Sequence, residues 1–152
     1  MRPHTLPVLS QRGSVSTPLC PSARSDWQGS VIFGVTEGSV DAPRVSYLTE
    51  PVEVSAAVLE LAGSVSPTEV FRFAAPCACD ECVHFQEKRC HLVEKVVELL
   101  PEVVTSLPPC SIRRDCRWFR QEGAAACRRC PQIVTDSFPR STQFVAVADP
   151  SL

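Results

Sequence analysis

The sequence of 152 residues carries a formal net charge of −2 and contains 44% hydrophobic residues. This length fits one domain, and the apolar fraction is close to the globular average, which argues against disorder across the whole chain. The small net charge does not favour a nucleic-acid partner bound through bulk charge. Because the sequence has neither a run of about 18 apolar residues nor a signal-like apolar segment, we expect no membrane span and a cytoplasmic location, where thiols stay reduced.

The first part of the chain is predicted to be a leader followed by a hairpin. Residues 1–26 are rich in Pro, Ser and Arg and show no periodicity, which predicts a flexible leader. Cys20 lies alone in this leader and is not expected to be a ligand. Residues 29–38 and 44–49 are rich in β-branched and aromatic residues and are bounded by Gly, Asp and Pro. This pattern predicts two short strands that form a hairpin.

Two helix starts are predicted after this hairpin. Residues 55–63 begin with a serine that can cap the first turn and end with a glycine, so they predict a short helix. Residues 66–69 combine a capping serine, a proline at the first helical position and a glutamate that reaches back to the cap. A short turn then ends at Pro76. We expect residues 27–76 to form a small α+β scaffold.

The Cys-rich region, over residues 77–135, is predicted to be mainly helical. Its clearest helix covers residues 91–100, where two apolar stripes lie beside a charged face. A further helical turn is predicted over residues 102–107. Another helix, over residues 112–122, places the thiol of Cys116 toward the interior beside apolar neighbours.

The end of the chain is predicted to be extended. Residues 132–135 and 143–147 are strand-like, so residues 136–152 are expected to form a C-terminal strand and tail. Together these elements predict a small Cys-rich α+β domain with short strands and three to four short helices, organised around bound metal.

Cysteine is the most informative residue type in this sequence. Eight of the nine cysteines lie between positions 77 and 130 and fall into two sets of four. Four thiolates saturate one zinc ion or one cubane iron–sulfur cluster, and clustered cysteines in a reducing compartment more often bind metal than form disulfides. We therefore predict one or two metal centres. The first set is Cys77, Cys79, Cys82 and Cys90, and the second set is Cys110, Cys116, Cys127 and Cys130.

The spacing of the second set favours an iron–sulfur cluster of the 4Fe-4S type. A cubane is larger than a zinc ion and tolerates longer, irregular spacings, and a proline after the last ligand, here Pro131, is frequent in ferredoxin-type sites. Zinc is the alternative, because Cys79 with Cys82 and Cys127 with Cys130 have the Cys-x2-Cys spacing of zinc knuckles. The spacing leaves open which cysteines share a site.

The two sets differ in local charge. The segment of the second set contains six arginines and two acidic residues, and we expect Arg113, Arg117 and Arg128 to lie beside the anionic cluster and offset its charge. The first set lies in an acidic segment. His84 and His91 are alternative ligands there, although a surface position is the simpler expectation for each.

One segment resembles a known family. Cys110-Ser-Ile-Arg-Arg-Asp-Cys116, followed by a predicted helix, is similar to the Cys-Pro-Val-Arg-x-x-Cys segment of the WhiB-like iron–sulfur regulators. The resemblance covers residues 110–119 and implies that Cys110 and Cys116 ligate a cluster. It does not extend to the regulatory role of that family, because a further cysteine and a Gly-Trp-rich turn are missing here.

Other chemistry is less well supported by the sequence. Cys127-Arg-Arg-Cys130 has the spacing of a redox dithiol but lacks a βαβ context, and a disulfide-stapled domain would require secretion. No phosphate-binding loop or His-Glu-x-x-His helix is present, so an autonomous enzyme is not expected. The expected function is that of an accessory or electron-transfer protein acting with a partner, such as a redox enzyme. The alternative is a non-catalytic zinc-binding module for protein interactions.

Overall fold

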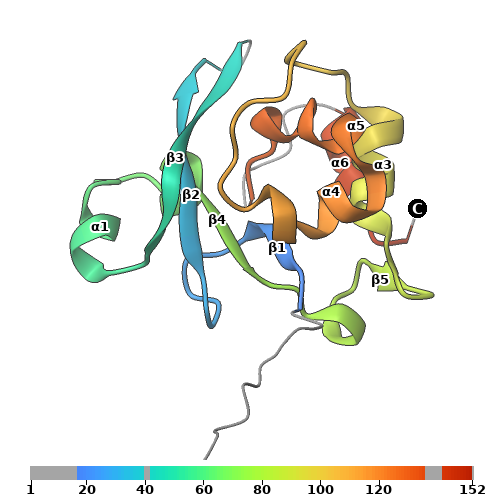
Figure 1. Cartoon of the computed structure of the whole chain (residues 1–152), viewed down its shortest axis with the longest axis horizontal. Helices are drawn as coiled ribbons and strands as arrows, with labels where there is room; N and C mark the ends of the chain where they lie inside the picture. Colours follow the sequence, from blue (N-terminus) through green and yellow to red (C-terminus); the bar gives the residue numbers. More distant parts are fainter. Residues whose placement is uncertain (1–16, 40–41, 136–141, 152) are drawn as a thin grey trace, which may run out of the picture.

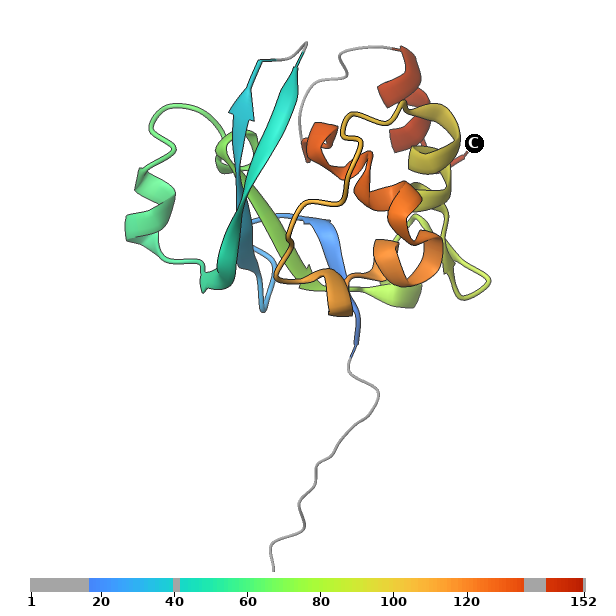
Figure 2. The same cartoon turned by 45° about the horizontal axis from the view of Figure 1, so that its top comes forward.

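The structure, a computed structural model, describes residues 17–39, 42–135 and 142–151. One layer is a twisted antiparallel sheet, and the other is a group of short helices (Figure 1, Figure 2). This arrangement confirms the predicted small α+β class. The strands of the sheet lie in the order β1-β4-β2-β3, with the bounds β1 Leu19–Ala23, β2 Val31–Gly38, β3 Pro43–Glu53 and β4 Phe71–Pro76.

The antiparallel hairpin of β2 and β3 confirms the predicted strand pair. Its pairing runs from Val31 opposite Glu53 to Gly38 opposite Pro43. Gly38 has a φ of +79°, and a Cβ at this position would collide with the carbonyl oxygen of Ala42. Glycine therefore permits the tight connection between the two strands.

β4 is a central strand, where the sequence predicted only a turn. Its residues 71–75 are all buried because both faces of the sheet are covered. Phe71 and Phe73 pack in an apolar cluster with α1 (Ala56–Glu60), whereas Ala74 packs in the cluster shared with the helical layer. Because side chains alternate along a strand, Arg72 is directed toward the helical layer like Ala74.

β1 lies within the segment predicted to be a flexible leader, and this prediction is wrong for residues 19–23. The strand pairs antiparallel with β4, with Cys20 opposite Ala75, and Leu19 forms an isolated parallel bridge with Cys116 in the helical layer. The strand was missed because Pro21 interrupts the pattern. Proline is tolerated here because β1 is an edge strand.

α1 and α2 (Pro67–Val70) confirm the two predicted helix starts. The Ser55 hydroxyl accepts a hydrogen bond from the Val58 amide at 3.2 Å. Ser66 and Glu69 form the predicted capping box, in which the glutamate accepts from the Ser66 amide. α1 lies on the opposite side of the sheet from α3 and α4 (Figure 1).

The helical layer contains the Cys-rich region. α3 confirms the clearest predicted helix, and its Val93 and Val96 are fully buried in the core with Phe33 and Trp118. No helix of the described ranges is long and apolar enough to cross a lipid bilayer. The elements of this layer are the hairpin β5 Phe85–Gln86 and β6 Arg89–Cys90, the helices α3 His91–Leu99, α4 Arg117–Glu122, α5 Ala124–Cys127 and α6 Thr142–Ala148, and the 3₁₀ turns η2 Cys79–Glu81, η3 Arg113–Asp115 and η4 Cys130–Gln132.

Several boundaries in this layer differ from the predictions. Residues 102–107 are not helical, and the helix predicted over residues 112–122 is interrupted at Cys116, which is extended and caps α4. Residues 132–135 are not a strand. Gln132 ends η4, and residues 133–135 belong to no helix or strand. Residues 143–147 belong to α6, which packs on α3, so the predicted C-terminal strand is wrong. Short apolar runs do not distinguish helix from strand by periodicity alone.

Candidate metal centre

The four cysteines of the second set line one cavity between the sheet and the helical layer, which we call the buried cavity. Phe33 and Tyr47 line it from the sheet, and Ile112 and Trp118 line it from the helical side. The cavity has a volume of about 20 Å³, which is room for about one water molecule. The structure thus brings together Cys110, Cys116, Cys127 and Cys130, as the sequence grouped them.

Short helices and turns bring these cysteines to the cavity. Cys110 precedes η3, Cys116 lies between η3 and α4, and Cys127 and Cys130 end α5 and begin η4. Gly123, with a φ of +66°, separates α4 from α5 and lets the chain turn back toward Cys116. A side chain is strained at this φ, so glycine permits the reversal.

Three thiols of the buried cavity, those of Cys110, Cys116 and Cys127, hold their protons more tightly than ordinary cysteines. Burial raises the pKa of the Cys116 thiol to about 12, although the Phe119 and Trp118 amides donate to its sulfur and oppose the rise. Burial also raises the pKa of Cys110 and Cys127, and the Arg113 guanidinium opposes both shifts. These thiols are therefore protonated at neutral pH unless a metal displaces the protons.

Arg72 is a buried cation beside Cys130, only 2% exposed. Its Nη2 donates to Cys130 Sγ at 3.2 Å and to the Pro21 carbonyl at 3.1 Å, and its Nη1 donates to the Cys130 carbonyl at 2.6 Å. Burial lowers the pKa of this guanidinium, but the Cys130 thiolate and Tyr47 outweigh that effect and raise the pKa. None of these three acceptors is a carboxylate, so no acidic side chain balances Arg72 through these hydrogen bonds.

Buried N–H groups around the cavity lack acceptors. The Trp118 indole Nε1 and the Arg113 Nε are buried and have no hydrogen-bond partner among the described residues. Both side chains line the buried cavity. Since buried donors are normally paired, these two groups fit a site whose occupant supplies acceptor atoms, as the sulfides and thiolates of a cluster do.

The three arginines predicted to lie beside the cluster have different positions. Arg113 lines the buried cavity and stacks at 5.9 Å from the Phe119 ring. Arg117 instead donates to Cys79 Sγ at 3.4 Å and belongs to the first set of cysteines. Arg128 does not line the buried cavity. Its guanidinium lies 3.9 Å from the carboxylate of Glu102.

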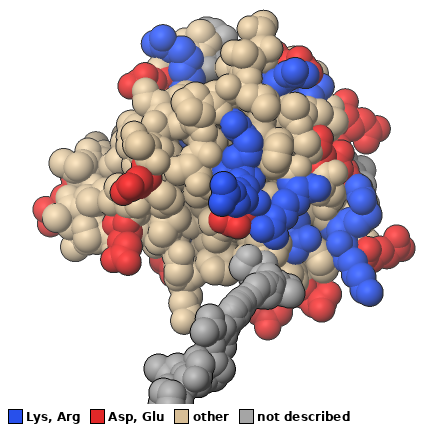
Figure 3. Space-filling model, viewed as in Figure 1, with Lys and Arg blue, Asp and Glu red and all other residues tan. Residues whose placement is uncertain are grey.

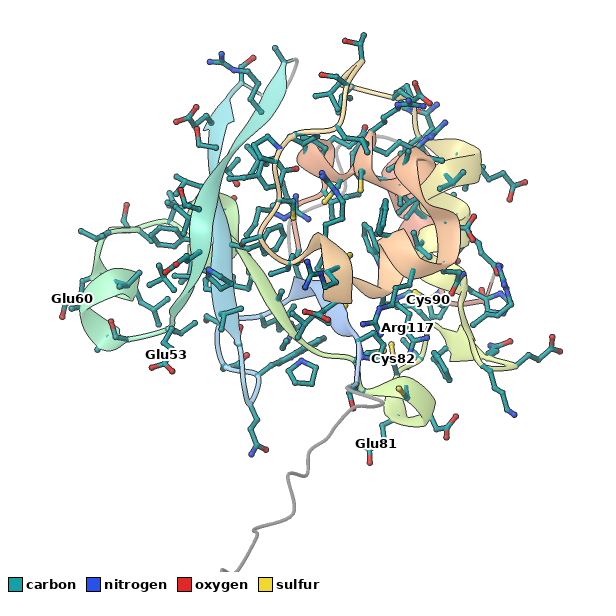
Figure 4. The ribbon with its side chains drawn as sticks, in the orientation of Figure 1. Glu53, Glu60, Glu81, Cys82, Cys90 and Arg117 are labelled. Carbon is teal, nitrogen blue, oxygen red and sulfur yellow. The ribbon has the colours of Figure 1, made fainter. Side chains whose placement is uncertain are left out.

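The first set of cysteines is only partly brought together. Cys77, Cys82 and Cys90 line a second cavity of about 590 Å³, which we call the wide cavity. Cys79 does not line it, whereas Cys20, which the sequence treated as an isolated cysteine, does. Figure 4 shows Cys82, Cys90 and Arg117 near one another on the side of the helical layer where β5 lies.

The two histidines of this segment, His84 and His91, lie in different places. His84 lines the wide cavity, and burial, followed by the charge of Lys95, lowers the pKa of its imidazole. His91 begins α3 instead, with its Nδ1 3.5 Å from the Glu94 carboxylate. Only His84 is therefore placed to reach an occupant of the wide cavity.

The thiols are unpaired in this structure. All nine cysteines are free, and all nine lie in the described ranges, so the disulfide alternative receives no support. Among the described residues, no three His, Cys, Asp or Glu side chains are grouped so that they could hold a single metal ion.

Comparisons with known proteins returned no relative. A scan against protein-family models, a search of curated proteins and a search of solved structures found no match.

Proposed function

We propose that Cys110, Cys116, Cys127 and Cys130 ligate a 4Fe-4S cluster, and that this protein is an accessory or electron-transfer protein acting with a partner redox enzyme. The observation that carries the proposal is the convergence of the four cysteines on the buried cavity, with the buried guanidinium of Arg72 3.2 Å from Cys130 Sγ. A group of thiolates explains why a cation is buried there without a carboxylate partner.

A cluster and a zinc ion would hold the four thiolates at different separations. Four thiolates on zinc lie about 3.8 Å apart, because each zinc–sulfur bond is about 2.3 Å long and the geometry is tetrahedral. A cubane places its own iron and sulfide atoms between the thiolates. The preference for the cluster over zinc rests on the long and irregular spacing of the four cysteines in the sequence, which a cubane tolerates better than a single ion.

The charges of the cavity wall support the same assignment. A 4Fe-4S cluster with four thiolates is a net anion, and positive charge and N–H donors around its sulfurs raise its reduction potential. Arg72 and Arg113 supply the positive charge. The Trp118 and Phe119 amides supply donors at Cys116.

Complete ligation by cysteine favours electron transfer over catalysis. Four cysteines saturate a cubane and leave no open coordination position for a substrate, as in closed structural metal sites. Cys116, Ile112 and Trp118 of the cavity wall are buried, which limits the access of a substrate from that side. Such a cluster can exchange an electron with a partner by an outer-sphere step. It has no free iron position at which a substrate could bind.

Basic side chains on the helical layer offer a docking surface for a partner. Figure 3 shows lysine and arginine side chains gathered on the face where Figure 1 places α4. Arg114 and Arg120 are exposed, and Arg120 belongs to α4. We propose that an acidic surface of the redox partner docks at this face, because complementary charge steers association.

Anaerobic purification tests the proposal. We expect a brown protein with thiolate-to-iron charge-transfer absorption and about four acid-labile sulfides for each cluster. Cys116→Ala and Cys127→Ala should each remove the cluster of the buried cavity, whereas Arg128→Ala should retain it as a matched surface control. A colourless protein with stoichiometric zinc would contradict the cluster, and full retention in both cysteine variants would contradict the ligand assignment.

A further inference from the structure

We propose that a second iron–sulfur cluster is held in the wide cavity by Cys20, Cys77, Cys82 and Cys90, and that Cys79 is not a ligand. This set contains Cys20, which lies 57 positions before Cys77, in place of Cys79. The inference extends the proposed function, but it concerns a separate site whose ligands are independent of those in the buried cavity.

Strand pairing brings Cys20 to the first set. Cys20 lies opposite Ala75 in the antiparallel pair of β1 and β4, and the Cys77 amide donates to the Pro18 carbonyl at 2.8 Å. The bridge between Leu19 and Cys116 holds the same strand against the helical layer. Backbone hydrogen bonds, rather than a flexible side chain, therefore fix the position of Cys20.

The four proposed ligands belong to the wall of one cavity. Cys20, Cys77, Cys82 and Cys90 all line the wide cavity, whereas Cys79 does not. Cys20 reaches this wall from β1, and Cys90 reaches it from the end of β6.

Cys79 has a different role from its neighbours. Its backbone is in the left-handed region, with a φ of +51°, and its amide donates to Cys77 Sγ at 3.4 Å. The His84 amide donates to Cys82 Sγ at the same distance. Amide donors of this kind stabilise thiolate ligands of clusters. The backbone of Cys79 thus supports the Cys77 ligand, while its side chain lies outside the cavity.

Unsatisfied polar groups also surround the wide cavity. His84 Nδ1 and Arg117 Nε are buried and have no hydrogen-bond partner among the described residues, and both side chains line the cavity. Arg117 additionally donates to Cys79 Sγ at 3.4 Å and lies 5.1 Å from the Phe85 ring. A cluster in this cavity would supply an anionic partner for the Arg117 guanidinium.

Iron and sulfide analysis of anaerobically reconstituted full-length variants tests this ligand set. The wild-type protein should contain about eight iron atoms per chain, Cys20→Ala about four, and Cys79→Ala about eight. Cys116→Ala should contain about four, which reports the buried cavity separately. Full iron in Cys20→Ala, or an equal loss in Cys79→Ala, would overturn the inference while leaving the buried-cavity cluster intact. Full iron in Cys116→Ala, with a loss in Cys20→Ala, would instead overturn the proposed function alone.

Alkylation of the unmodified protein gives a second test that does not depend on the folding of a variant. Iodoacetamide should label Cys79 in the fully loaded wild-type protein without loss of iron, as mapped by peptide mass spectrometry. Labelling of Cys20 should require prior removal of the iron. Protection of Cys79 in the loaded protein, followed by its labelling after iron removal, would show that it is a ligand and would overturn the inference.

Discussion

Leu19 and Cys116 form a parallel β-bridge that joins the edge of the sheet to the start of α4. The next residue after Leu19 is Cys20, which lines the wide cavity, whereas Cys116 itself lines the buried cavity. Trp118, which is 1% exposed, lines both cavities. The two proposed clusters are therefore neighbours that share one indole as a common wall.

Loading of the clusters should quench the fluorescence of Trp118. A cluster absorbs across the emission range of tryptophan. Trp118 is buried and borders both cavities, whereas Trp27 is 38% exposed and lines only the wide cavity. We expect most of the buried-indole emission of the metal-free protein to disappear on anaerobic reconstitution. The Trp118→Phe variant keeps an aromatic side chain and should lose this loading-dependent change, while Trp27→Phe should retain it. Unchanged emission of Trp118 after full loading would contradict its position between the sites.

Replacement of Arg72 should lower the reduction potential of the cluster in the buried cavity. Arg72→Met removes a buried positive charge and the hydrogen bond to Cys130 Sγ. We expect a decrease on the order of 60 mV, equivalent to about 1.4 kcal/mol for one electron. Redox titration followed by electron paramagnetic resonance measures this shift, and Arg128→Met is the control with an exposed charge. Equal potentials in Arg72→Met and wild-type protein would contradict a cluster next to Cys130.

The stability of the metal-free protein should decrease as the pH rises above about 9. The pKa of Cys20 and of Cys116 is about 12 in the folded chain, against an ordinary value of 9.0. Between these values the unfolded chain has lost protons that the folded chain still binds, so each pH unit lowers the free energy of unfolding by about 1.4 kcal/mol per thiol. This contribution is complete below pH 9 and is lost progressively toward pH 12.

The metal-loaded protein should show the opposite pH dependence below about pH 9. Its ligand thiolates carry no protons when folded, whereas the unfolded chain binds protons at those sulfurs, so stability should rise with pH. Urea unfolding of both forms at several pH values checks the two signs. A metal-free protein that is equally stable at pH 8 and pH 10 would contradict the burial of these thiols.

The second set of cysteines could be grouped from the sequence, because short helices and turns keep residues 110–130 close together in space. The burial of Cys116 followed from the apolar spacing, even though the helix around it is interrupted there. By contrast, the position of Cys20 depends on the pairing of β1 with β4, which joins segments more than 50 residues apart. Spacing within the cysteine cluster contains no information about such a pairing.

Arg72 was also missed, although the sequence contains a signal for it. It stands between Phe71 and Phe73 in a strand that is buried on both faces, where a charged residue requires a partner. Had this strand been predicted, its buried arginine would have indicated a site next to it. The net excess of arginines near Cys110 to Cys130 pointed to Arg113, which lines the buried cavity. Proximity in the sequence did not predict that Arg117 contacts the other set.

The most direct test of the central claim is a crystal structure of the anaerobically purified protein with anomalous data collected on both sides of the iron absorption edge. The account predicts a strong iron peak in the buried cavity, within bonding distance of the sulfurs of Cys110, Cys116, Cys127 and Cys130. An anomalous peak that appears only at the zinc edge, or an iron peak that none of these four sulfurs ligates, would contradict it.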